Sequence, residues 1–471
     1  MRDKVISLAR KSGGLFIASA VSLMFSFLFV FFLARLLGAE LYGYIPLARS
    51  SQLILEAFLE FGLASALIKR LSSPDDQLKI IGTSLSLKTI AGGVSTLALI
   101  AMSLAAPPPM NIYILAMSPF PLFAFLLTNV RSVYSSKMEL LKVSILAILP
   151  DFLRFCIAIL LFYLGFGVLS GIFGYVGGAA ITLALALAFL QRDRLLHFSF
   201  DLEEAKRQLF LGLFLNSTQL SSYFFPSFVT ILSAFLLSIS DVSVIAVSMS
   251  FAATIYIFLS PITAFFYPFT CEHYSNPKFN TFLRFLIRYW AAFLLLSLLA
   301  VQIGAGFVFG LLGKSFLVGS SVFLVIAAAV FLDSFKQISD YYFIARNKQK
   351  YIVLFEGVKF LIFFLSLIYI FYSHSAFGIE SISWAILAAY ASAFALRLVF
   401  LYKSCPLELL LIPKAAILFG IFFYFGFQAS GFTGKLLLFF AGAVLVLLFG
   451  LIKISDLAYL REIAENKTSG G

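Results

Sequence analysis

Charged side chains are scarce in this sequence of 471 residues. Asp, Glu, Lys and Arg together make up only 12% of it, whereas soluble domains carry about 25%. Hydrophobic residues account for 62%, and the mean hydropathy is +1.03. This balance excludes a water-soluble globular protein and predicts an integral membrane protein.

Cysteine and histidine are also rare, with three residues of each. They lie far apart without CxxC or other metal-ligand spacing, so we expect structural thiols and no metal site. The loop GxxxxGK[ST] and the motifs HExxH and GxSxG are absent, so we expect no cofactor and no enzyme activity. Energy for transport would then come from a gradient of H⁺ or Na⁺, or of the substrate. The residues concerned are Cys156, Cys271, Cys405, His197, His273 and His374.

Long apolar runs recur along the whole chain, and each is long enough to cross a hydrocarbon core of about 30 Å as a helix. They predict an all-α polytopic protein with about 14 transmembrane helices. Six helices would form each of two bundles around a central cavity, followed by two C-terminal helices. The predicted spans are 13–34, 41–67, 83–105, 111–130, 143–164, 168–190, 209–237, 242–270, 285–309, 316–335, 351–372, 379–401, 412–428 and 434–454.

A net charge of +12 could suggest a nucleic-acid partner, but the distribution of the cations predicts none. Nearly all of them fall in one set of alternate connections between spans, which the positive-inside rule places in the cytoplasm. Both termini would then be cytoplasmic in a multi-pass protein of the cell's inner membrane. The opposite connections hold only Arg35, Lys314 and Lys435, against for example Lys69, Arg70, Lys79, Lys88, Arg131, Lys137 and Lys142 on the cytoplasmic side.

The chain divides naturally near its middle. The charged, amphipathic stretch 191–208 predicts an interfacial helix that links two halves. We expect a six-helix bundle over 1–190, this linker, a second six-helix bundle over 209–403, and two extra helices with a cytoplasmic tail over 404–471. The halves show weak similarities in parallel orientation, typical of transporter repeats.

The second predicted span carries a polar stripe formed by Arg49, Gln52, Glu56 and Glu60, which fall within an arc of about 80° on a helix. Exposure of these side chains to lipid is too costly, so they must line a cavity or pair within the bundle. Arg49 and Glu56 are two turns apart, about 10 Å along the axis, which predicts that they are poor direct partners. Arg49 would then bind an anion such as a diphosphate, or pair with another helix. Glu56 and Glu60 repel each other, so we expect a shared proton or cation and a candidate ion-coupling site.

The seventh span predicts a second inward-facing polar stripe. Asn216, Gln219 and Tyr223 share one helical face and are candidates for lining the substrate cavity, although close helix packing would explain the face equally well. Prolines break long helices here and in the next span, and serve either as hinges for alternating access or as static kinks. They are Pro226, Pro261 and Pro268.

Other charges within spans occur at i, i+3 spacing, which predicts ion pairs. Asp151 with Arg154 and Glu356 with Lys359 are such pairs, and we expect them toward the cytoplasmic ends of their helices, where basic side chains reach water. The alternative is a basic vestibule in which Arg154, Lys359 and Arg397 receive an anionic headgroup.

The stretch LARLLGAELYGYIPLARS (33–50), followed by EFGLASALIKRLS (60–72), resembles the opening signature of the polysaccharide exporter or O-antigen flippase (Wzx-like) family. That family belongs to the multidrug, oligosaccharidyl-lipid and polysaccharide (MOP) exporter superfamily. The resemblance implies two bundles that open alternately to each side of the membrane. It also implies translocation of a polyprenyl-diphosphate-linked oligosaccharide to the outer leaflet, with Arg49 as a contact for the diphosphate, and other polysaccharide-assembly membrane proteins as possible partners.

Three competing functions follow from the sequence. A small-molecule antiporter for organic cations would share the architecture but needs a predominantly acidic cavity. A lipid II flippase is a close variant of the leading hypothesis. A glycan polymerase or ligase would need a large outer loop and a catalytic constellation, and the sequence has neither.

Overall fold

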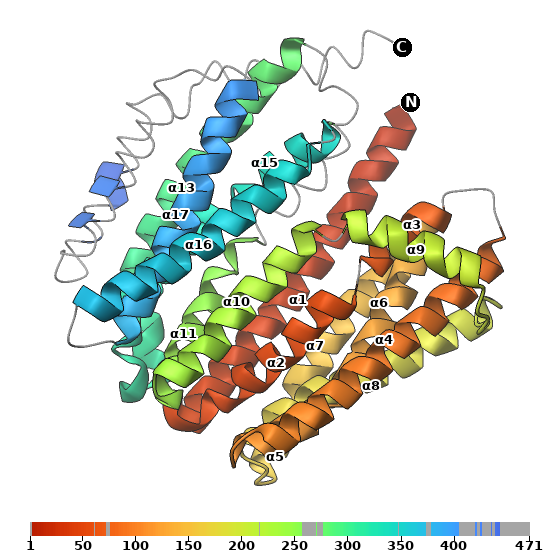
Figure 1. Cartoon of the computed structure of the whole chain (residues 1–471), viewed down its shortest axis with the longest axis horizontal. Helices are drawn as coiled ribbons and strands as arrows, with labels where there is room; N and C mark the ends of the chain where they lie inside the picture. Colours follow the sequence, from red (N-terminus) through yellow and green to blue (C-terminus); the bar gives the residue numbers. More distant parts are fainter. Residues whose placement is uncertain are drawn as a thin grey trace. The chain divides into compact units, whose positions relative to one another are not determined.

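The computed structural model describes residues 2–60, 62–71, 76–215, 217–256, 270, 277–346, 348–373, 378–404 and short stretches between 420 and 442. Within these ranges the secondary structure is helical, with no strand. The chain divides into two compact units, one made of Arg10–Ser250 and the other of Phe251–Gly471 with Met1–Ala9. Figure 1 labels the helices of both units.

The first unit contains most of α1 (Arg2–Tyr42), then α2 (Tyr44–Leu59), α3 (Leu63–Leu71), α4 (Gln77–Ala105), α5 (Met110–Met117), α6 (Phe120–Ser136), α7 (Leu140–Tyr163), α8 (Val168–Arg192), α9 (Leu202–Leu215), α10 (Ser217–Leu236) and most of α11 (Ile239–Ala252). The second contains α13 (Pro277–Leu312), the 3₁₀ helix η1 (Lys314–Phe316), α14 (Gly319–Asp333), α15 (Lys336–Ala345), α16 (Lys350–Ser373) and α17 (Ile379–Ser404).

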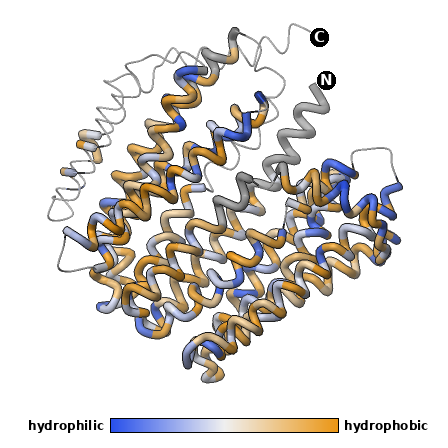
Figure 2. Tube along the Cα trace, in the orientation of Figure 1, coloured by the Kyte–Doolittle hydropathy of each residue, from blue (hydrophilic) through white to orange (hydrophobic). Residues whose placement is uncertain are grey.

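The protein is a multi-pass membrane protein, and nine spans in the described part of the chain are long and apolar enough to cross a bilayer. A tenth is counted if the bent pair α2 and α3 is one span. The predicted span 209–237 contains the shorter apolar helix Phe224–Leu236, and the predicted span 242–270 overlaps the shorter apolar helix Ile239–Ala252. Most of the last two predicted spans lies outside the described residues, as do Pro261, Pro268 and Asn216. Apolar residues cover the lengths of the helices (Figure 2), as contact with lipid requires.

The second predicted span is broken. α2 ends at Leu59, α3 begins at Leu63, and the two are bent by 45°. Gly62 adopts a positive φ of 64°, a conformation that favours glycine, because a side chain there would clash with the backbone. The carboxylate Oε1 of Glu60 accepts a hydrogen bond of 3.3 Å from the backbone N–H of Ala64, near the start of α3. This bond satisfies one of the free donors at the new helix start.

Glycines on α8 allow it to pack closely against α7. A Cβ on Gly174 would lie 2.8 Å from the Arg154 carbonyl oxygen, and one on Gly178 would lie 2.8 Å from the Pro150 carbonyl oxygen. Only residues without a side chain permit this approach of the two backbones. Glycine at these two positions therefore serves close helix packing.

Hydrogen bonds and an ion pair hold the linker that precedes α9 against α4. The Ser86 hydroxyl donates to the Ser199 carbonyl oxygen at 2.9 Å, and the Asp201 backbone N–H donates to Thr83. Lys79 lies 2.9 Å from the Asp201 carboxylate. The hydrogen bond from the Glu204 backbone, followed by that from Lys79, lowers the pKa of Asp201 below its usual value.

α9 itself packs against α3 and α4 (Figure 1). Arg70 on α3 makes a bidentate pair with Glu204, at 3.0 and 2.8 Å, and Gln208 donates to the Ile80 carbonyl oxygen at 3.1 Å. The predicted linker 191–208 thus consists of the end of α8, a stretch without regular secondary structure and the first half of α9. Its attachments keep it on the first unit, while the predicted division into two six-helix bundles remains a prediction.

The core of the second unit is aromatic. The Trp290 indole on α13 lies 4.8 Å from the Phe335 ring and 5.7 Å from the Phe394 ring, measured between ring centroids, and its N–H donates to Ser334 at 3.1 Å. α14 is buried along most of its length, and α17 packs against both α14 and α16. This packing brings α15, α16 and α17 together around the charged residues described below.

Candidate functional site

A pocket of about 270 Å³ lies within the first unit, among helices α1, α2, α6, α7 and α8. Arginines from three different helices line it, against two carboxylates, so the wall is predominantly basic. Aromatic and small apolar side chains complete it. The lining residues are Ser22, Arg49, Glu56, Phe120, Ala124, Leu127, Thr128, Arg131, Leu146, Ala147, Pro150, Asp151, Arg154, Tyr175 and Ala179.

The polar stripe of α2 forms a chain of contacts. Arg49 Nη1 donates to Gln52 Oε1, and Gln52 Nε2 donates to Glu56 Oε2 at 2.6 Å. Arg49 Nη1 also lies 3.9 Å from Glu56 Oε2. The prediction that Arg49 and Glu56 are poor direct partners is therefore wrong. The axial separation ignored the length of the arginine side chain, and the fully buried Gln52 bridges the remaining distance.

Arg154 reaches the same pocket from α7. Its Nη2 lies 2.9 Å from Asp151 Oδ1, and the hydroxyl of Ser22 on α1 donates to Asp151 Oδ2. The Nε of Arg154 is buried without a hydrogen-bond partner in the described part of the chain, which is uncommon for a buried donor. The pair is confirmed, but its predicted place is wrong, because both residues lie near the middle of α7 and not at its end.

Both guanidinium groups lie over aromatic rings. Arg49 Cζ lies 4.6 Å from the Phe120 centroid and 5.4 Å from that of Tyr175. Arg154 Cζ lies 4.6 Å from the Phe29 centroid and 4.7 Å from that of Tyr175. These distances are within the range of cation–π attraction. The structure thus brings Arg49 and Arg154, two of the predicted site residues, to one aromatic wall.

Glu60 lies apart from this pocket. Its Oε1 is 2.7 Å from the Nζ of Lys88 on α4, and that ammonium lies 5.2 Å from the Phe125 ring. Lys88 is fully buried inside α4, so the prediction that it lies in a cytoplasmic connection is wrong. The carboxylates of Glu56 and Glu60 each have their own basic partner, and their role in ion coupling remains a prediction.

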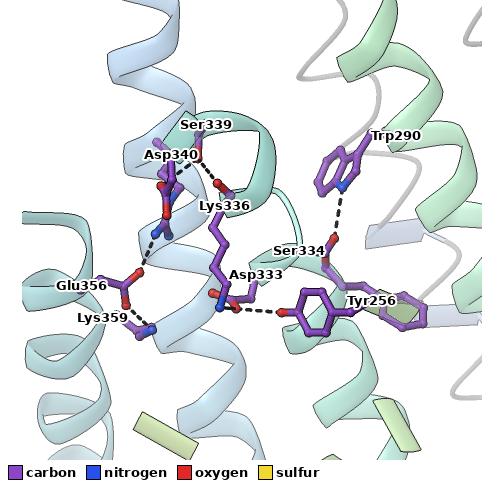
Figure 3. Close-up of polar contacts among 11 residues, drawn as sticks. Tyr256, Trp290, Asp333, Ser334, Lys336, Ser339, Asp340, Glu356 and Lys359 are labelled. Carbon is purple, nitrogen blue, oxygen red and sulfur yellow. Dashed lines mark hydrogen bonds and ion pairs between the residues drawn. The ribbon is translucent and has the colours of Figure 1, made fainter. Parts of the chain in front are cut away.

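The other predicted cationic residues lie in the second unit, in a buried charge network (Figure 3). Arg397 on α17 bonds Glu356 on α16 at 2.5 Å and Asp340 on α15 at 3.3 Å. Lys359 pairs with the other oxygen of Glu356. This confirms the predicted i, i+3 pair.

A further pair extends the network. Lys336 Nζ lies 2.6 Å from the Asp333 carboxylate, which also accepts a hydrogen bond of 2.9 Å from the Tyr256 hydroxyl (Figure 3). Three carboxylates and two of the three cations are buried, and the third cation, Lys336, is half-buried, so the network is balanced in charge. It fastens α15, α16 and α17 to one another. That Lys359 and Arg397 contact a headgroup remains a prediction.

The remaining candidates come from α10. Pro226 lies inside this helix, and its carbonyl oxygen accepts a hydrogen bond of 2.9 Å from the Thr230 hydroxyl. The backbones of Gln219 and Tyr223 lie in α10, but their side chains are outside the described part of the structure. Among the described residues, no group of three or more His, Cys, Asp and Glu side chains could hold a metal ion.

Sequence analysis missed several lining residues. Arg131 was assigned to a cytoplasmic connection, yet it lies on α6 and lines the pocket. Tyr175 is one of 20 tyrosines, and nothing in its local pattern marks it except the glycines on either side, Gly174 and Gly178. Ser22 was not identified, because its partner Asp151 lies 129 positions further along the chain.

Comparisons with known proteins agree with this architecture. Residues 8–272 match the family described as "Polysaccharide biosynthesis protein". No curated protein matches the sequence significantly.

Three solved structures show the same fold. The first is an inward-facing multidrug resistance MATE family transporter of the MOP superfamily, with TM-score 0.66, 17% identity, and coverage of 83% of this chain and 98% of that one. The second is the lipid II flippase MurJ in an inward closed conformation, with TM-score 0.64, 15% identity, and coverage of 96% of this chain and 100% of that one. The third is a MOP superfamily transporter from Pyrococcus furiosus, with TM-score 0.54, 15% identity, and coverage of 84% of this chain and 95% of that one.

Proposed function

Because the chain belongs to the polysaccharide biosynthesis protein family, we propose that it is a flippase for a polyprenyl-diphosphate-linked oligosaccharide. It moves this lipid from the cytoplasmic to the outer leaflet by alternating access, driven by a gradient of H⁺ or Na⁺. The observation that carries the proposal is the basic pocket of the first unit, where Arg49, Arg131 and Arg154 come from three helices.

The chemistry of the pocket suits a diphosphate. A guanidinium group bonds phosphate oxygens bidentately and stays charged when it leaves water. Arg49 and Arg154 are only 23% and 11% exposed at their side chains, so an anion between them would meet a poorly screened field. The volume of about 270 Å³ lies near the lower end of the range for small-molecule sites. The pocket therefore fits a headgroup, while the polyprenyl chain stays in lipid.

The pocket disfavours the organic-cation alternative. A cation would have to approach three arginines against the carboxylates of Glu56 and Asp151, both of which already face a guanidinium. The MATE likeness, at 17% identity, concerns the fold. A lipid II flippase is a second candidate, since the MurJ structure covers 96% of this chain and a lipid-linked disaccharide would present the same diphosphate.

The distribution of positive charge supports a location and an orientation in the membrane. We place the protein in the cytoplasmic membrane with both termini in the cytoplasm. Other membrane proteins of polysaccharide assembly would supply the lipid-linked glycan and consume it.

The test is a leaflet-resolved measurement of polyprenyl-diphosphate glycans in cells that lack the protein and any redundant flippase. Without the protein, the glycans should accumulate on the cytoplasmic leaflet. Wild-type protein should restore export, Arg49→Ala should not, and Arg192→Ala, an exposed arginine at the end of α8, should restore it as well as wild type does. An unchanged leaflet distribution without the protein would refute the proposed function.

A further inference from the structure

Tyr175 is the one side chain over which both paired arginines of the pocket lie, among the contacts described. Arg49 approaches its ring from α2 at 5.4 Å, and Arg154 approaches from α7 at 4.7 Å, both measured from Cζ to the ring centroid. The two arginines are 105 positions apart in the sequence, so no local structure relates them. The ring on α8 is the contact that the two guanidinium groups share.

The position of the ring is itself fixed by close packing on two sides. Gly174 and Gly178, which flank Tyr175, seat α8 directly on the backbone of α7 at Arg154. On the other side, a Cβ on Gly171 would lie 2.5 Å from the side chain of Ile45 on α2. The backbone around Tyr175 therefore has little freedom to shift relative to either arginine-bearing helix.

Neighbouring rings also restrict the Tyr175 side chain. The Phe29 and Phe120 rings meet it edge-on, at centroid distances of 5.1 and 5.8 Å and interplanar angles of 76° and 85°. This T-shaped arrangement is favourable for aromatic pairs. The same two rings lie next to Arg154 and Arg49, respectively, so the three rings form a continuous wall beneath both cations.

We propose that Tyr175 is a positioning residue that holds Arg49 and Arg154 as a two-point clamp, one guanidinium for each phosphate of a lipid diphosphate. The inference rests on the proposed function. A guanidinium on an aromatic face keeps its in-plane N–H groups free for phosphate oxygens. The buried Nε of Arg154 is one such donor, since it has no hydrogen-bond partner within the described residues.

The clamp makes a prediction about specificity. A diphosphate engages both arginines at once, whereas a monophosphate engages only one. Loss of the ring leaves both cations in the pocket, paired with Glu56 and Asp151, but removes the contact that they share. Each guanidinium can then shift relative to the other, because each arginine has several rotatable bonds. The preference for diphosphate over monophosphate should then fall, even though the charge of the pocket is unchanged.

The experiment measures the binding of geranylgeranyl diphosphate and geranylgeranyl monophosphate to the full-length protein in nanodiscs. The readout is the ratio of the two dissociation constants. Wild-type protein should prefer the diphosphate by about tenfold, as expected for one additional charge-assisted contact. Tyr175→Phe keeps the ring and should keep the ratio, whereas Tyr175→Leu should reduce it to about threefold or less.

Two further variants make the outcome decisive. Phe173→Leu removes a ring from the same helix that pairs with Phe166 at 6.2 Å, and it should leave the ratio unchanged. Tyr175→Met also removes the ring but fills its place with an unbranched apolar side chain, and it replaces Tyr175→Leu if that variant does not fold. A folded ringless variant with the wild-type ratio overturns the clamp alone, whereas equal binding of both probes by wild-type protein overturns the diphosphate assignment as well.

Discussion

The buried pair of Glu60 and Lys88 gives the sharpest prediction about stability. Lys88 is fully buried, and its ammonium lies 2.7 Å from the Glu60 carboxylate. We expect Lys88→Met to destabilise the protein strongly, because it leaves the Glu60 carboxylate buried at the bend between α2 and α3 without its cation. Methionine keeps the apolar stem, so the change removes mainly the charge.

The magnitude can be worked from the contact. Two unit charges at 2.7 Å attract by about 6 kcal/mol at an effective dielectric constant of about 20. Desolvation of both groups offsets part of this attraction in the intact protein, but removal of one partner typically costs about 3–5 kcal/mol. Glu60→Gln should cost a similar amount, because it leaves the fully buried Lys88 ammonium without its carboxylate, although the amide oxygen still accepts the hydrogen bond from Ala64.

The assay is a double-mutant cycle. The midpoints of thermal unfolding in detergent are compared for wild-type protein, Lys88→Met, Glu60→Gln and the double variant. The double variant should be more stable than the sum of the single losses predicts, with a coupling of about 1–3 kcal/mol. If the two losses simply add, the ion pair does not hold the bend, and the argument from its burial is wrong.

Other predictions concern packing, the second unit and pH. Gly178→Ala should destabilise the protein by about 1–3 kcal/mol through overpacking against α7, whereas Gly93→Ala, where a Cβ would meet nothing within 4 Å, should be neutral or stabilising by up to about 1 kcal/mol. Thermal unfolding of both variants checks this. Lys359→Met should cost about 3–5 kcal/mol, measured in the same way, and an unchanged midpoint would contradict a paired role for this buried cation. The lowered pKa of Asp201 stabilises the folded state above the unfolded pKa of about 3.9, and this contribution is lost as the pH falls from about 5 through the lowered value. Asp201→Asn should therefore flatten the pH dependence of unfolding below about pH 5, and an identical acid profile would show that the lowered pKa of Asp201 does not contribute to stability.

Most spans could be predicted because hydrophobicity is a local property. The predicted span 143–164 compares with a helix over Leu140–Tyr163, and 379–401 with Ile379–Lys403. The break after Leu59 could not be predicted, because it depends on the conformation of Gly62, and one glycine inside an apolar run carries little information.

The candidate site was only partly predictable. Arg49 was identified because a charge inside an apolar span is conspicuous in the sequence. Its partners depend on side-chain reach and on tertiary contacts: Gln52 bridges it to Glu56, and Tyr175 comes from a helix more than a hundred residues away. Lys88 was misassigned for the same reason, since its position near the start of a span says nothing about the carboxylate that faces it.

The glycine contacts between α7 and α8 also have a mechanical consequence. Backbone atoms that approach this closely leave no room for one helix to slide along the other. We therefore expect α7 and α8 to move as one rigid body during transport. Arg154 and Tyr175 must then travel together, and their separation should stay constant through the transport cycle. A pair of spin labels at Leu160 and Ile181, exposed positions on the two helices, would therefore report one fixed distance while other helices move.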